Sequence, residues 1–172
     1  IDADNDLYPW AQGDIQNLAS PGSTDKVNIV YMLDKPSENG TGGWYYWVSQ
    51  KGTIGGVPVG GLPVLQSTLP EPNMGDPMTL ENFIRWAQSN YPAKKYALVL
   101  WDHGGGRYGV CGDWTSGDEE ILTTPELQTA LSDLACLGWP HINLITFMAC
   151  SMASIEVAYQ IKDYCDVMVG SE

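Results

Sequence analysis

Residues 142–152 read Ile-Asn-Leu-Ile-Thr-Phe-Met-Ala-Cys-Ser-Met, in which a largely apolar run leads to a cysteine at position 150. The β-branched part of this run, over 142–147, predicts a buried strand. The segment that follows, 153–163, predicts a helix, and Val167–Val169 starts another strand. A strand, a helix and a strand in this order are typical of a parallel sheet whose strands are joined by helices.

The same alternation extends toward the N-terminus. We expect strands over 27–33 and 96–101, and helices over 7–18, 79–90 and 124–134, the first capped by Asp6 and the second by Thr79. Residues 36–78 instead carry many Gly and Pro, which predicts β-hairpins and a long loop. The sequence therefore predicts an α/β three-layer sandwich, with a mostly parallel sheet, helices on both faces and a β-hairpin insertion over 36–78.

Length and composition fit one domain. The chain has 172 residues, of which 44% are hydrophobic, and contains no apolar run approaching the ~20 residues of a transmembrane helix. We expect a single domain over 1–172 that has been cut at both ends from a longer polypeptide. Eight Lys and Arg against 21 Asp and Glu give a net charge of −13. This balance argues against nucleic acid or an anionic membrane as the main partner, because no basic field is available to neutralise phosphates.

Two reactive residues follow predicted strands at the edge where open α/β sheets bind their ligands. His103 follows the strand over 96–101, and Cys150 follows the strand over 142–147; the separation, 150 − 103 = 47 residues, fits neighbouring parallel strands. A helix N-terminus next to Cys150 would stabilise a thiolate, and a nearby His could accept the thiol proton. Spacing alone leaves open that Cys150 is a small buried hydrophobe and that the glycines after His103 only form a turn.

Two blocks of sequence resemble the clostripain family of cysteine peptidases. Residues 98–106, Leu-Val-Leu-Trp-Asp-His-Gly-Gly-Gly, and 109–113 resemble its histidine block; residues 142–152, 155–159 and 169–172 are similar to its cysteine block, and 2–7 to the end of its first strand. The resemblance implies a caspase-like fold and hydrolysis of peptide bonds through a thioester acyl-enzyme. His103 would be the general acid and base, and Cys150 the nucleophile. Backbone N–H groups of Gly104 and Cys150 would form the oxyanion hole.

The resemblance also implies a peptide or protein substrate and a secreted or cell-envelope location. Members of the family commonly cleave after Arg or Lys and often have an acidic residue two positions before the cysteine. That substrate-binding position is Met148 here, and a thioether cannot attract a cation. We therefore expect an uncharged residue at P1. In addition, no Lys or Arg lies between Tyr108 and Ile161, so the segment joining the two blocks lacks a basic cleavage site.

Metal sites are not favoured by the sequence. Asp2, Asp4 and Asp6 resemble the opening of a calcium loop, but its sixth and twelfth positions hold Leu7 and Gly13 instead of Gly and Glu. We expect these aspartates to cap and stabilise the first helix. No Cys-x-x-Cys occurs, which argues against structural zinc. We therefore expect no metal and no cofactor, although relatives can depend on calcium.

Other candidates have plainer interpretations. Asp102 could orient His103, but adjacent side chains on an extended segment point in opposite directions, so a structural role is favoured. His141 is expected to be solvent-exposed and without a partner, and Cys111 and Cys136 to be structural or free thiols. The run Trp44-Tyr-Tyr-Trp47 is expected to pack across a hairpin. As a ligand surface, it would suit the alternative function, a non-catalytic binding module. The sequence predicts no oligomeric state.

Overall fold

The computed structural model describes residues 1–36, 42–54, 57–114 and 120–172. The chain divides into two compact units, one made of Ile1 and Ala3–Pro72 and the other of Asp2 and Asn73–Glu172. The expected single domain, with 36–78 as its insertion, remains a prediction.

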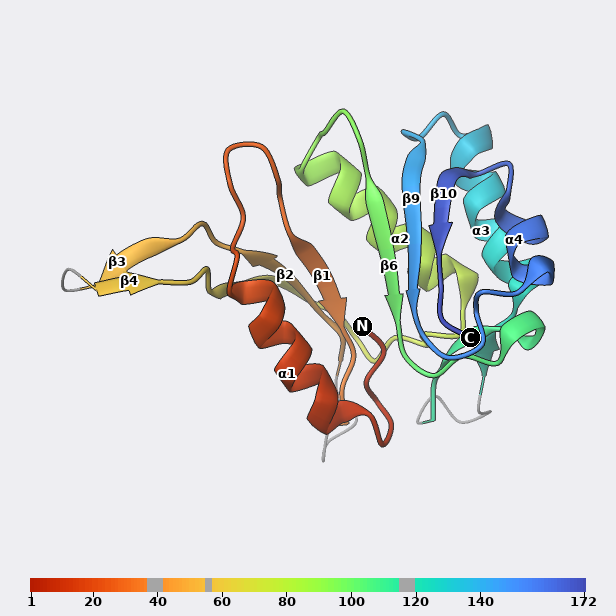
Figure 1. Ribbon diagram of the computed structural model, residues 1–172, viewed down its shortest axis with the longest axis horizontal. Helices are drawn as coiled ribbons and strands as arrows, with labels where there is room; N and C mark the ends of the chain where they lie inside the picture. The colour runs from red at the N-terminus through yellow and green to blue at the C-terminus, as the bar shows by residue number, and fades with distance from the viewer. Residues whose placement is uncertain (37–41, 55–56, 115–119) are drawn as a thin grey trace. The chain divides into compact units, whose positions relative to one another are not determined.

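The first unit combines one helix with antiparallel strands (Figure 1). Its sheet has the order β1-β2-β5, and a separate two-stranded ribbon pairs β3 with β4. The elements are α1 (Tyr8–Ala19), β1 (Val30–Leu33), β2 (Trp44–Val48), β3 (Gly52–Ile54), β4 (Val57–Val59) and β5 (Pro63–Thr68). The strands within 36–78 agree with the hairpins predicted there.

The aromatic run of β2 packs across the sheet, as predicted. Tyr46 lies opposite Tyr31 of β1, and their rings stack with centroids 5.0 Å apart. Tyr45 is buried, and the ammonium group of Lys35 lies 4.7 Å from the ring centroid of Trp44. These contacts account for the aromatic run by cross-strand packing.

The second unit contains the parallel sheet, with strand order β10-β9-β6 (Figure 1). Its elements are α2 (Pro77–Asn90), β6 (Ala97–Trp101), the 3₁₀ turn η1 (Gly106–Tyr108), β7 (Val110–Gly112), β8 (Ile121–Leu122), α3 (Thr124–Cys136), β9 (Ile142–Met148), α4 (Ile155–Ile161) and β10 (Cys165–Val169). The β6, β9 and β10 segments were predicted as strands to within two residues. This parallel sheet with its connecting helices confirms the predicted α/β class.

One apolar core holds this sheet to its helices. Alternate residues of β6, Leu98 and Leu100, are buried, and the helices contribute apolar residues at helical spacing. The core comprises Leu80, Ile84, Leu98, Leu100, Val110, Cys111, Leu122, Leu127, Ala130, Leu131, Leu134, Ile142, Ile145, Phe147, Ala149, Met152, Val157 and Ile161.

Helix starts differ from the prediction at two places. The residue before α1 is Leu7, which makes no side-chain cap, so the predicted cap at Asp6 is wrong. Instead, Asn5 Oδ1 accepts from the Leu7 N–H at 2.9 Å. The α2 helix begins earlier than predicted because Asp76 accepts from the Met78 N–H at 2.8 Å, and Pro77 then occupies the first turn. The predicted cap at Thr79 is therefore wrong.

Candidate functional site

The carboxyl ends of β6 and β9 lie level with each other. Trp101 pairs with Met148 in the parallel register, and the Asp102 N–H donates to the Met148 carbonyl at 3.3 Å. His103 and Cys150 each follow these paired residues by two positions. Both residues are exposed. The prediction that His103 and Cys150 follow neighbouring parallel strands at one edge is confirmed.

The two segments beyond these strands are in close backbone contact. A Cβ atom placed on Gly104 would lie 2.2 Å from the Cys150 carbonyl oxygen and 3.0 Å from the Ala149 Cβ. One placed on Gly106, whose φ is +60°, would lie 3.2 Å from the Ser151 carbonyl oxygen. Only glycine allows the segment after His103 to approach the turn at Cys150 this closely.

A short hairpin, β7–β8, contacts the residues on both sides of His103. On one side, the Gly112 N–H donates to Asp102 Oδ2 at 2.7 Å. On the other side, Gly104 forms a β-bridge with Val110. Asp102 is only 3% exposed and accepts a backbone hydrogen bond, which agrees with the structural role predicted for it.

Trp114 is a neighbour of His103 that the sequence analysis missed. Its ring stacks on the imidazole with the planes 4° from parallel and the centroids 6.3 Å apart. Trp114 lies 11 positions after His103, beyond a turn and a strand, so no periodicity relates the two residues. Only the course of the β7–β8 hairpin brings them together.

The cysteine is not at a helix N-terminus, which corrects the prediction. Cys150 and Ser151 form a turn, and Ser151 adopts a left-handed φ of 62°. The α4 helix begins only at Ile155, where Ser154 is the cap and its Oγ accepts from the Val157 N–H at 3.3 Å. The influence of a helix dipole falls off within about one turn, so it cannot explain a reactive thiol at this position.

Cys111 and Cys165 differ from Cys150 in their burial, whereas Cys136 is exposed like Cys150. All four cysteines are free, as expected for Cys111 and Cys136. Burial raises the pKa of the Cys111 thiol well above its usual value, and the negative charges of Asp2 and Asp102 raise it further. Burial also raises the pKa of Cys165. Cys150 is thus an exposed thiol at the sheet edge, whereas Cys111 is a protonated thiol in the core.

Met148 lies at the rim of the same edge. It is the last residue of β9, and 48% of it is exposed. Its side chain brings no charge to the neighbourhood of Cys150.

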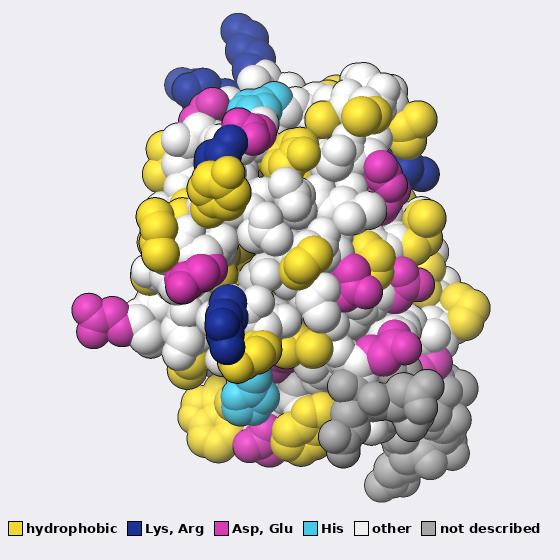
Figure 2. Space-filling model, turned by 90° about the vertical axis from the view of Figure 1, so that its right-hand side faces the viewer, with side chains coloured by type: hydrophobic (Ala, Val, Ile, Leu, Met, Phe, Trp, Pro, Cys, Tyr) yellow, Lys and Arg dark blue, Asp and Glu magenta, His cyan; other side chains and the backbone are white. Residues whose placement is uncertain are grey.

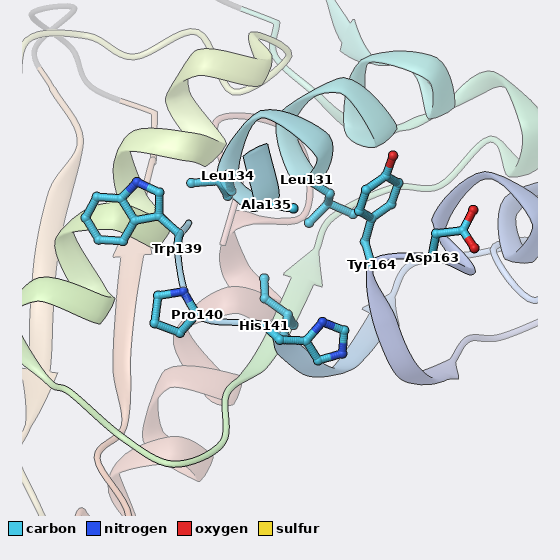
Figure 3. Close-up of a pocket in the computed structure, with 9 residues that line it drawn as sticks. Leu131, Leu134, Ala135, Trp139, Pro140, His141, Asp163 and Tyr164 are labelled. Atoms are coloured by element: carbon cyan, nitrogen blue, oxygen red, sulfur yellow. The ribbon is translucent and has the colours of Figure 1, made fainter. Parts of the chain in front are cut away.

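The opposite end of the parallel sheet carries a separate pocket. It lies where β9 begins and is lined by Leu131, Leu134, Ala135, Trp139, Pro140, His141, Ile142, Asp163 and Tyr164. Figure 3 shows Trp139 and Tyr164 on opposite sides of this pocket. The pocket includes neither His103 nor Cys150, and in Figure 2 the two histidines of the chain reach the surface at opposite ends.

The prediction that His141 has no partner is wrong. His141 Nε2 lies 3.1 Å from Asp166 Oδ1, and the Asn143 amide donates to the other oxygen of Asp166 at 2.7 Å. These hydrogen bonds lower the pKa of Asp166, the one from Asn143 more than the one from His141. His141 directly precedes β9, Asn143 belongs to β9 and Asp166 to β10, so the contact depends on the pairing of these strands.

Acidic residues of the first unit form a group with the geometry to hold a cation. Oxygen atoms of Asp4, Asp34 and Glu71 all lie within 4.8 Å of one another, and Asp4 and Asp34 are buried. Among the His, Cys, Asp and Glu residues of the described ranges, these three form the group whose potential ligand atoms lie that close together. Asp4 therefore belongs to a buried acidic cluster, in contrast to the helix-capping role predicted for it.

The described part of the chain contains no helix that is long and apolar enough to cross a membrane.

Comparisons with known proteins agree with this arrangement. The clostripain family model matches residues 1–172. Clostripain from Hathewaya histolytica is 34% identical over 105 residues, which cover 54% of this chain and 19% of that protein.

Solved structures extend the similarity to the fold. A secreted C11 cysteine protease from Bacteroides thetaiotaomicron, solved with an irreversible peptide inhibitor, is 26% identical and superposes with a TM-score of 0.76 over 98% of this chain and 46% of that chain. An inactive zymogen C11 protease from Parabacteroides distasonis is 23% identical, with a TM-score of 0.74 over 98% of this chain and 45% of that one. The chain thus spans about half the length of these structures and a fifth of clostripain. This chain belongs to the clostripain family.

Proposed function

We propose that this chain carries the catalytic dyad of a cysteine endopeptidase, with Cys150 as nucleophile and His103 as general acid and base. The observation that carries the proposal is the contact between the two segments: Gly104, next to His103, approaches the Cys150 carbonyl so closely that no side chain fits. Together with the level ends of β6 and β9, this contact favours a nucleophile and a base at one edge of the sheet. Membership of the clostripain family supports the same reaction class.

The chemistry proceeds in two steps. In the first, the imidazole of His103 takes the Cys150 proton, and Sγ attacks the carbonyl carbon of the scissile peptide bond. A C–S bond forms, the C–N bond then breaks, and His103 returns the proton to the departing amine. In the second, His103 takes a proton from water, whose oxygen attacks the thioester. The C–S bond breaks, the carboxylic acid leaves and the thiol regains its proton.

Backbone groups supply the oxyanion hole in this proposal. The N–H groups of Gly104 and Cys150 belong to the two segments that touch, so both can converge on one developing oxyanion. Donors fixed in a backbone need no reorganisation as charge develops, and one such donor typically contributes ~10²–10³-fold in rate. Their position depends on the glycine contact that keeps the two segments together.

The substrate is a peptide or protein with an uncharged P1 residue. This part of the proposal depends on Met148, which is half-exposed at the rim beside the dyad and brings a thioether in place of a carboxylate. A carboxylate there would stabilise a basic P1 side chain in a desolvated pocket, and a thioether gives a cation no such advantage over an apolar group.

Kinetics of two variants of the full-length protein test the proposal. Cys150→Ala and His103→Ala should each abolish hydrolysis of a fluorogenic peptide, because the nucleophile and its base act as one unit. Both side chains are exposed, so each variant should lose no more than about 1–2 kcal/mol of unfolding free energy. Substantial hydrolysis by either variant would contradict the assignment of the dyad. A wild-type protein that binds peptides without cleaving them would favour the non-catalytic binding module.

A further inference from the structure

We propose that Trp114 is a positioning residue for His103, an inference that rests on the proposed dyad. Two side chains that follow different strands meet here: the Trp114 ring lies in an offset stack with the imidazole, with the planes 4° from parallel and the centroids 6.3 Å apart. Aromatic rings at such separations attract each other beyond the effect of burial alone.

The β7–β8 hairpin fixes both partners of the stack. The Gly112 N–H donates to the side chain of Asp102, the residue before His103, and Val110 forms a β-bridge with Gly104, the residue after it. The same hairpin presents Trp114 two residues after β7 ends. Because the hairpin that carries Trp114 also bonds to the residues on either side of His103, the stack can set the orientation of the imidazole relative to the sheet edge.

A β-bulge in the hairpin lies next to its contact with Asp102. The β7–β8 register shifts between Val110 and Gly112, and the residue between them, Cys111, adopts a left-handed φ of 59° that non-glycine residues seldom adopt. Burial of the Cys111 side chain in the core offsets the cost of this conformation. The bulge allows the next N–H group, that of Gly112, to reach Asp102.

The residue before Trp114 is also held by hydrogen bonds. The preceding residue, Asp113, is fully buried, and its Oδ2 accepts from the Met74 N–H at 2.9 Å. The Asp113 N–H donates to the Glu120 carbonyl at 2.9 Å, which continues the hairpin pairing. Trp114 is nevertheless 54% exposed. The contact of Trp114 that bears on the site is its stack on His103.

Steady-state kinetics of the full-length protein separate positioning from substrate contact. Trp114→Ala should lower kcat about tenfold and leave KM within about twofold, because a poorly oriented base slows proton transfer in the transition state without weakening peptide binding. Trp114→Phe should recover kcat to within about threefold of wild type, since it retains a ring face. Leu137→Ala, which removes a 64% exposed apolar side chain just after α3, should behave as wild type.

Each other outcome overturns the inference. An increase in KM with kcat unchanged would make Trp114 a wall of the substrate site, and equal losses in Trp114→Phe and Trp114→Ala would show that the ring face has no role. If Trp114→Ala does not fold, Trp114→Phe decides, because a loss of kcat there greater than about threefold contradicts the expected recovery. Cys150→Ala, assayed alongside, distinguishes the two proposals. If that variant still cleaves, the dyad fails; if it is inactive and Trp114→Ala is fully active, only the positioning role fails.

Discussion

Replacing Gly104 with alanine should reduce activity about 100-fold without removing any polar group. The new Cβ would lie 2.2 Å from the Cys150 carbonyl oxygen, whereas a carbon and an oxygen normally approach no closer than about 3.3 Å. The two segments must therefore move apart by about 1 Å. The obstacle is backbone, with the Ala149 Cβ and the Met152 Cγ behind it at 3.0 Å, so no flexible side chain can absorb the shift.

A displacement of about 1 Å between catalytic groups costs on the order of 100-fold in rate. Overpacking of this kind also costs about 1–3 kcal/mol of stability. Alanine keeps the backbone N–H, so the loss reports the position of the donor and not its removal. kcat/KM of the purified full-length variant on a fluorogenic peptide, with its denaturant midpoint, measures both effects.

Gly112→Ala is the matched control for this variant. Gly112 lies on the adjoining strand β7, and a Cβ placed there meets nothing within 4 Å. Its N–H, which donates to Asp102, is retained, so activity should stay within about twofold of wild type. If Gly104→Ala is as active as Gly112→Ala, the contact between the two segments is not what holds the dyad together, and the reasoning fails.

Three further predictions concern specificity, processing and the buried thiol. Met148→Glu should shift the P1 preference toward Arg and Lys, because a carboxylate at the rim attracts a cation. An unchanged preference in a P1-varied peptide set would show that Met148 is not part of the substrate site. Residues 108–150 should remain uncut in active protein, or be cut after a non-basic residue, since no Lys or Arg lies between Tyr108 and Ile161; mass spectrometry that finds a nick after Arg107 would contradict this. Because burial raises the pKa of Cys111 in the folded state, its stabilising contribution should be complete at pH 7 and decline as the pH rises above about 9, the value for a solvated thiol. Denaturant midpoints between pH 7 and 10.5 should therefore fall less in Cys111→Ala than in wild type, and an equal fall would contradict the assignment.

The strands of the parallel sheet and their shared edge were predictable from local patterns in the sequence. The apolar runs over 96–101 and 142–147 became neighbouring parallel strands because each is long enough to cross the core and ends at polar or glycine residues. Their shared edge, with His103 and Cys150, followed from that register.

Features that depend on contacts distant in the sequence were not predictable. Trp114 reaches His103 through a bulged hairpin, and His141 meets Asp166 only because β9 and β10 pair. The four-residue interval from Cys150 to the α4 cap carries no periodic signal, so the helix was predicted two residues too early. Asp4 likewise joins Asp34 and Glu71, 30 and 67 residues further along the chain.

Irreversible labelling of the full-length protein tests the central claim most directly. A peptide with an uncharged P1 residue and a thiol-reactive carbonyl group is added in steps, and residual activity and the mass of each cysteine-containing peptide are followed together. Activity should fall in proportion to modification of Cys150, reach zero at one label per molecule, and leave Cys111 unmodified; His103→Ala should react far more slowly. Full modification of Cys150 with activity retained, or loss of activity with the label on another cysteine, would contradict the assignment of Cys150 as the nucleophile.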